Sequence, residues 1–147
     1  MRALVQRVAS ARVVAGGEVV GAIGHGLLVL VGIHRDDTPA DGVWMGRKLL
    51  SLRIFEDARG KMSRSVEEVN GELLIVSQFT LYGDARKGAR PDFGAAMPTE
   101  AARTFYEEWI ALLRRSCALP IREGRFAAMM QVELVNDGPV TLMLDSR

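Results

Sequence analysis

The sequence predicts an α+β fold in which two main helices cover a curved, mostly antiparallel sheet or barrel. About seven or eight short apolar, β-branched runs bounded by turn residues are spread along the chain, as expected of strands. Only two stretches have apolar residues at helical spacing, too few for a doubly wound parallel sheet. With 147 residues, 48% of them hydrophobic and 25% charged, the chain fits a single globular domain, residues 1–147.

The first third of the chain is predicted to form strands. Val8 and Val13 lie in short β-branched runs, and the Gly16-Gly17 pair offers a hairpin turn after them. A second glycine turn leads into residues 27–33, a continuous apolar run typical of a strand buried on both faces.

A first helix is predicted to begin after Thr38. Thr38 can cap it, and Pro39 suits the first helical position. Asp41 lies in the first turn, where the helix dipole favours an anion. An interrupted apolar face continues to about Arg53, and residues 54–60 hold a short strand and a turn.

The middle of the chain combines a buried strand, a long loop and a second helix. Residues 73–76 are predicted to be a strand that runs directly into Ser77. Residues 82–97 have no clear period and carry several basic side chains, and a loop of this length in a small domain is usually functional. Apolar residues at helical spacing predict the second helix from Pro98 onward.

The end of the chain is predicted to be a pair of strands, residues 130–135 and 140–144. The four residues between them, 136–139, read Asn-Asp-Gly-Pro, and each of these types is typical of a turn. Only about one X-Pro bond in twenty is cis in folded proteins, so this segment alone predicts a trans peptide in an ordinary hairpin.

Composition and spacing argue against several classes of function. The formal net charge of +1 gives no general attraction to nucleic acid, so a polyanion must be held by a local patch. His25, His34 and Cys117 are scattered without metal-like spacing, and no glycine-rich phosphate loop opens a helix. We therefore expect neither a metal nor a cofactor. The histidines are expected at the surface and Cys117 as a small core side chain.

A cytoplasmic location is expected. The single cysteine allows no intrachain disulfide, and the N-terminus has no signal-peptide pattern. The longest apolar run, residues 26–33, is too short to span a bilayer, so no membrane partner is expected.

Polar side chains follow the buried strand of residues 73–76. Ser77, Gln78 and Thr80 come directly after it, where the strand fixes their position and the following loop gives access. The alternative is that the two hydroxyls only satisfy backbone groups at a strand end. No histidine is evidently placed to activate a hydroxyl nucleophile.

Several segments point to one family when they are taken together. They are Leu52-Arg53-Ile54-Phe55, Gly60-Lys61-Met62, Ser77-Gln78-Phe79-Thr80-Leu81, Gly88 with Arg90-Pro91 and Phe93, and Phe126 with Met130-Gln131-Val132 and Asn136-Asp137-Gly138-Pro139-Val140-Thr141. They closely resemble the D-aminoacyl-tRNA deacylases, also called D-tyrosyl-tRNA deacylases, and the resemblance covers essentially the whole chain. The Ser-Gln-x-Thr-Leu and Asn-x-Gly-Pro-x-Thr segments are specific in combination. Ser63 and Ala89 depart from the family pattern, outside the core of the expected site.

The resemblance implies hydrolysis of the ester that joins a D-amino acid to the 3′-terminal adenosine of tRNA. It also implies a homodimer in which Gly138 and Pro139 of one subunit, joined by a cis peptide, enter the pocket of the other. Backbone atoms cannot swing aside as a side chain can, so such a gate would exclude an L side chain sterically. Achiral glycine would not be excluded, and glycyl-tRNA is therefore a second expected substrate.

The same resemblance assigns roles to individual residues. The catalytic candidates are Ser77, Gln78 and Thr80, with backbone N–H groups around Phe79 and Thr80 facing the carbonyl oxygen. Phe79 and Met130 are expected to line the adenosine or aminoacyl pocket. Arg7 is expected to brace the Gly138-Pro139 segment, with a surface ion pair as the alternative. The basic residues expected at the tRNA phosphates, unless they are simply solvated, are Arg86, Lys87 and Arg90.

Two mechanisms stay open at this point. Either Thr80 Oγ attacks the ester and forms an acyl-enzyme, or the ribose 2′-hydroxyl helps to orient water while Thr80 holds the substrate. The absence of an evident base favours the second. A small-ester or peptide hydrolase would need a recognisable Ser-His-Asp set. A non-catalytic RNA-binding barrel would need surface aromatics for base stacking, whereas aromatic residues are 6% of this chain.

Overall fold

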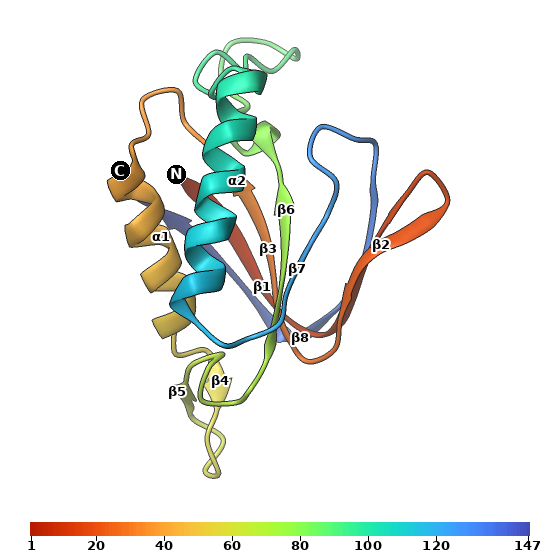
Figure 1. Ribbon diagram of the computed structural model, residues 1–147, viewed down its shortest axis with the longest axis vertical. Coiled ribbons are helices and arrows are strands. Elements are labelled where there is room, and N and C mark those ends of the chain that lie inside the picture. The colour runs from red at the N-terminus through yellow and green to blue at the C-terminus, as the bar shows by residue number, and fades with distance from the viewer.

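A six-stranded mixed sheet forms the body of the molecule, with two helices packed against one of its faces (Figure 1). The computed structural model describes residues 1–147. In chain order the elements are β1 (Arg2–Ala15), β2 (Glu18–Ile23), β3 (Gly26–Gly32), α1 (Pro39–Ser51), β4 (Phe55–Glu56), β5 (Met62–Arg64), β6 (Glu72–Ser77), the 3-10 helix η1 (Phe79–Tyr82), α2 (Thr99–Ser116), β7 (Ile121–Glu123) and β8 (Gln131–Asp145).

Strand β1 organises the sheet. It pairs antiparallel with β3 over its first half and with β2 over its second half, while β8 lies antiparallel along its other edge. Strands β6 and β7 extend the sheet beyond β3 as parallel neighbours. The fold class predicted from the sequence is confirmed, since two main helices cover a mostly antiparallel sheet.

The sheet curls toward a barrel because β2 approaches β7. A Cβ atom at Gly21 would lie 2.4 Å from the carbonyl oxygen of Glu123, closer than real side-chain atoms come. Glycine at this position therefore permits the close approach of the two strands. The hairpin between β1 and β2 turns, as predicted, at Gly16 and Gly17, whose φ angles are 60° and 80°.

Helix α1 begins at Thr38 as its sequence predicts. The Asp41 carboxylate accepts hydrogen bonds from the backbone N–H and the hydroxyl of Thr38, both at 2.9 Å. These bonds, together with one from the Ser146 hydroxyl, lower the pKa of Asp41 to about 2. The two helices meet where Trp109 Nε1 of α2 donates a hydrogen bond to the Gly42 carbonyl of α1 at 2.9 Å.

The prediction of two C-terminal strands joined by a turn is wrong. Strand β8 continues through residues 136–139, and both of its halves pair with β1. The partners Gln6–Thr141 and Val8–Asn136 leave more residues on β8 than on β1, so the surplus forms a bulge. Asn, Asp, Gly and Pro are as suitable for a bulge as for a hairpin turn, so the residue types alone do not distinguish the two structures. The Gly138–Pro139 peptide within the bulge is cis, as the resemblance implied.

The residues set aside as non-functional lie mostly where the sequence predicts. His25 is exposed, and Cys117 packs partly buried against the core. His34 differs from the prediction, because its side chain is only 19% exposed and contacts the ring of Tyr82. None of the helices has the length and apolar character needed to cross a membrane.

Candidate active site

A mostly apolar cavity of about 640 Å³ lies beyond the ends of β3 and β6. Its walls come from these strands, η1, the 93–97 loop, the start of α2, and the segment between β7 and β8. Open strand ends beside loops are a common location for binding sites, because the sheet holds the floor rigid. The larger and polar side chains of the lining include Ser77, Gln78, Phe79, Phe93, Met97, Phe126, Met129 and Met130.

The floor of the cavity is set by the end of β6. Ser77 is the last residue of β6 to pair with β3, and the Gln78 backbone N–H donates to the Val31 carbonyl at 2.7 Å. The Ser77 hydroxyl lines the cavity and makes no hydrogen bond within the chain. The Gln78 amide donates a hydrogen bond to Thr80 Oγ1, and Thr80 is exposed outside the cavity lining. Of the two hydroxyls, only that of Ser77 faces the cavity.

The rim is apolar and exposed. The Phe79 side chain is 56% exposed and packs edge-on against Phe93, with ring centroids 5.2 Å apart. Met129 is 92% exposed, whereas Met130 is half-buried and its sulfur accepts a hydrogen bond from the Arg125 backbone N–H. Aromatic and thioether side chains of this kind suit the flat face of a nucleobase or an amino-acid side chain.

No side chain lining the cavity can act as a base near neutral pH. The two buried phenols, Tyr82 of η1 and Tyr106 of α2, lie outside the lining. Burial, and then the negative charges of Asp37 and Asp145, raise the pKa of Tyr82 well above its ordinary value. Tyr82 therefore stays protonated, and the cavity offers polar groups that bind and orient but none that removes a proton.

A second cluster surrounds the Gly138–Pro139 bulge. The Arg7 guanidinium is buried and donates to the carbonyl oxygens of Ile54, at 2.7 Å, and Asp137, at 3.2 Å. It also pairs with the carboxylates of Asp137, at 3.2 Å, and Glu56, at 3.9 Å. Arg7 therefore forms ion pairs, as the alternative supposed, but its guanidinium is buried and not at the surface.

Asn136 holds the base of the bulge from inside. Its side-chain amide donates to the carbonyl oxygens of Arg7, at 2.9 Å, and Val140, at 3.0 Å. The Thr141 hydroxyl donates back to the Asn136 amide oxygen at 3.3 Å. From the sequence, Asn136 is a turn residue and part of the family motif, with no bonding partner predicted, because Arg7 lies 129 residues away along the chain.

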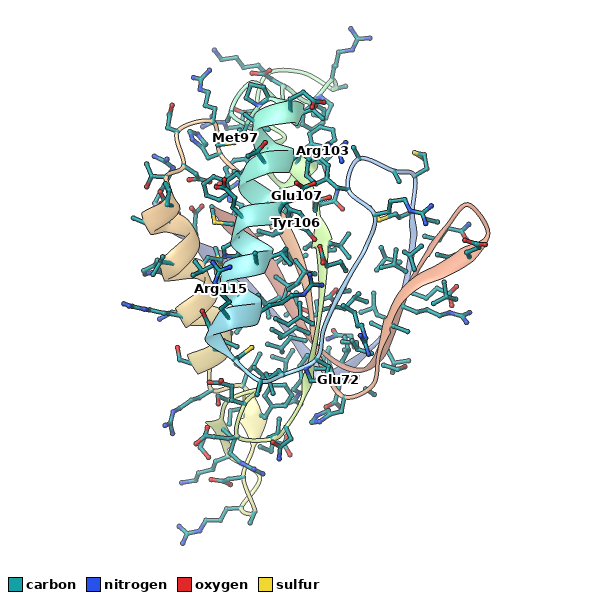
Figure 2. The ribbon with its side chains drawn as sticks, in the orientation of Figure 1. Glu72, Met97, Arg103, Tyr106, Glu107 and Arg115 are labelled. Atoms are coloured by element: carbon teal, nitrogen blue, oxygen red, sulfur yellow. The ribbon has the colours of Figure 1, made fainter.

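The two clusters lie at opposite ends of the sheet. Across the sheet, Asn136 of β8 pairs with Val8 of β1, Val8 pairs with Gly26 of β3, and Gly26 pairs with Glu72 at the start of β6. Ser77 is at the other end of β6. Five residues of strand separate Glu72 from Ser77, which corresponds to about 17 Å. Figure 2 shows the same separation, with Glu72 near one end of the sheet and Met97, from the cavity wall, near the other. A single chain therefore does not bring the two segments together.

The basic part of the loop, residues 84–92, lies beside the cavity without lining it. Its base is closed by a bridge between Asp84 and Asp92. Arg86 forms hydrogen bonds to the Asp84 carboxylate that lower the pKa of Asp84 to about 2, so this arginine is already paired. Lys87 and Arg90 are exposed and form no ion pair. Of the three residues predicted to meet phosphate, these two are the free cations.

The fold and the cavity describe a small α+β protein with an apolar binding cavity, and sequence comparison identifies its family. The family model described as D-Tyr-tRNA(Tyr) deacylase matches residues 4–145, so the chain belongs to this family. A D-aminoacyl-tRNA deacylase of Chlorobaculum parvum is 57% identical over 146 residues, which is 99% of this chain and 98% of the relative. The corresponding protein of Anaeromyxobacter dehalogenans is 58% identical over 147 residues, 100% of this chain and 98% of the relative.

Solved structures share the fold of this chain. A c-Myc DNA unwinding element binding protein superposes with a TM-score of 0.95 at 49% identity, covering 100% of this chain and 99% of the other. A probable eukaryotic D-amino acid tRNA deacylase superposes with a TM-score of 0.81 at 20% identity, covering 97% of each chain. The second likeness establishes the fold alone.

Proposed function

We propose that this protein hydrolyses the ester bond of D-aminoacyl-tRNA in the cytoplasm, releasing the D-amino acid and free tRNA. The observation that carries the proposal is the cavity itself: it offers Ser77, Gln78 and an aromatic rim at the end of a rigid strand, without any side-chain base. An aminoacyl ester is already activated, so orientation and stabilisation of the developing oxyanion can suffice for its hydrolysis. Membership of the deacylase family supports the same substrate.

The active form is a homodimer in which the Gly138–Pro139 bulge of one subunit enters the cavity of the other. The separation of about 17 Å within one chain supports this arrangement, because only a second copy can bring the two segments together. The exposed apolar residues of β8 support it further. This long strand pairs only with β1, and an open edge with apolar side chains is normally covered. These side chains are Leu134, Val135, Leu142 and Met143.

The bulge acts as a chiral gate. A pocket wall made of backbone excludes an L side chain sterically, because backbone held by Arg7 and Asn136 cannot rotate out of the way. A glycyl ester has no side chain to exclude, and we therefore expect glycyl-tRNA to be hydrolysed too.

Water, oriented with help from the ribose 2′-hydroxyl, is the nucleophile. Thr80 Oγ accepts a hydrogen bond from Gln78 and lies outside the cavity lining, which argues against a covalent role for Thr80. Backbone N–H groups at the start of η1, around Phe79 and Thr80, are placed to stabilise the carbonyl oxygen. Lys87 and Arg90 supply the local positive charge for the acceptor-end phosphates.

The test compares D-tyrosyl-tRNA, L-tyrosyl-tRNA and glycyl-tRNA in single-turnover reactions with the same enzyme preparation. The proposal requires hydrolysis of the D ester and the glycyl ester, with the L ester released at the uncatalysed rate. Equal rates for the D and L esters would refute the gate. A failure to release glycine at high enzyme concentration would refute selection by exclusion, and loss of all three activities would refute the proposed function.

A further inference from the structure

We propose that the β4–β5 hairpin of one subunit is an RNA-binding arm that contacts phosphates of the tRNA held in the other subunit's cavity. The inference rests on the proposed function, because it requires both a tRNA substrate and exchange of the Gly138–Pro139 bulge. The tRNA would then be held by two basic surfaces: the basic loop beside the cavity, and the hairpin of the opposite subunit.

The hairpin and the bulge are joined through one buried side chain. Arg7 donates to the carbonyl of Ile54, the residue that precedes β4, and pairs with Glu56 at the end of β4. The same guanidinium bonds Asp137 of the bulge. Wherever the bulge inserts, the root of the hairpin is therefore carried to the same place.

The unpaired charges at the tip of the hairpin are cations, because each of its carboxylates has a partner. The Asp57 carboxylate is consumed inside the turn, where it accepts hydrogen bonds from the backbone N–H groups of Arg59 and Lys61 and from the Ser63 hydroxyl. Glu56 faces Arg7. The side chains of Arg59 and Lys61 are exposed at the tip and have neither an ion pair nor a hydrogen bond. Two free cations on a short projecting arm suit the phosphate backbone of RNA.

The position of the hairpin favours contact with RNA held by the other subunit. Figure 1 shows β4 and β5 at one end of the molecule and the basic loop between η1 and α2 at the other. The cavity is lined by residues at the end with the basic loop, so the hairpin lies far from the RNA 3′ end bound by its own chain. Insertion of the bulge into the opposite cavity brings the hairpin end of one subunit to the cavity end of the other. From Glu56 the tip extends about 10 Å further along the hairpin, which lengthens the reach of the arm.

The first experiment removes the two tip cations as Arg59→Ala with Lys61→Ala. The matched control is Arg47→Ala with Arg115→Ala. It removes two exposed, unpaired cations from helices α1 and α2, away from the hairpin tip (Figure 2 labels Arg115). Binding of uncharged tRNA is measured by fluorescence anisotropy at several salt concentrations. The tip variant is expected to bind about tenfold more weakly and to lose about 1.5 from the slope of log K against log salt, while the control changes little.

Hydrolysis of D-tyrosyl-adenosine separates RNA binding from a damaged active site. This fragment has no phosphates beyond the terminal nucleoside, so the tip variant should hydrolyse it at the wild-type kcat/KM while losing about tenfold on D-tyrosyl-tRNA. A tip variant that matches the control on tRNA would overturn the arm. If the wild-type enzyme hydrolyses neither compound, the proposed function fails, and the binding measurement still decides whether the hairpin contacts RNA.

Mixed dimers test which subunit supplies the arm. One chain carries Ala96→Trp, which fills its cavity, so that only the other chain's cavity is active. The tip substitutions are then placed either in the blocked chain or in the active one. If the proposal is correct, hydrolysis of D-tyrosyl-tRNA is slowed when the blocked chain carries the tip substitutions. It is normal when the active chain carries them. The reverse result would overturn contact from the opposite subunit.

Discussion

The amide of Asn136 gives the sharpest test of how the bulge is held. Asn136→Ala removes hydrogen bonds of 2.9 and 3.0 Å to the carbonyls of Arg7 and Val140, and a weaker one of 3.3 Å from Thr141. A net contribution of about 1 kcal/mol for each of the two good bonds gives about 2 kcal/mol. The value rises toward about 4 kcal/mol if both part-buried carbonyls are left without partners.

The stability change is measured by urea unfolding, with Thr141→Val as the control. That variant removes the Thr141 hydroxyl but leaves both carbonyl bonds of Asn136 in place, so its loss should stay below about 1 kcal/mol. In the same preparation, Asn136→Ala should lower kcat on D-tyrosyl-tRNA by about 10- to 100-fold, because a small displacement of the gate misplaces the ester. Wild-type stability and wild-type D/L selectivity in Asn136→Ala would refute the reasoning.

Three further predictions follow from the site and the helix cap. Thr80→Ala should keep most of kcat in a single-turnover assay on D-tyrosyl-tRNA, since Thr80 lies outside the cavity lining; this result would exclude Thr80 as the nucleophile, and a complete loss would contradict its placement away from the substrate. Lys87→Ala should lower the salt slope of tRNA binding by about 0.8, whereas Arg86→Ala should change it little because Arg86 is paired with Asp84; equal effects would contradict this pairing. Asp41→Asn should be less stable than wild type above pH 4 by about 1 kcal/mol after allowance for solvent screening. Because folding lowers the pKa of Asp41 from 3.8 to about 2, that difference should vanish as the pH falls toward 2, and urea unfolding from pH 6 to pH 2.5 measures it.

Local patterns were sufficient for elements whose signals lie close together in the chain. The cap of α1 at Thr38, the glycine hairpin after β1 and the buried strand that ends at Ser77 were all predicted from neighbouring residues, and the structure confirms them. Each depends on backbone preferences or apolar periodicity over a few residues, which sequence alone expresses.

Local patterns did not predict the bulge in β8 or the contacts by which Arg7 holds it. A run of Asn, Asp, Gly and Pro suits several backbone paths, and the path here is decided by pairing of both strand halves with β1. The burial of Arg7 depends on carbonyl groups from residues 54 and 137, which are distant along the chain. Phe93 and Phe126 belong to the segments that resemble the family, but only the folded structure shows that both form the cavity wall.

Apolar periodicity, turn chemistry and motif residues are local properties, and they were enough to predict the fold class, the family and the polar segment at the end of β6. The packed fold was needed to show that Ser77, and not Thr80, lines the cavity, and that this cavity lies about 17 Å along the sheet from the bulge that holds Gly138 and Pro139. Side-chain direction and strand register arise from pairing between distant segments, and so no local pattern contains them.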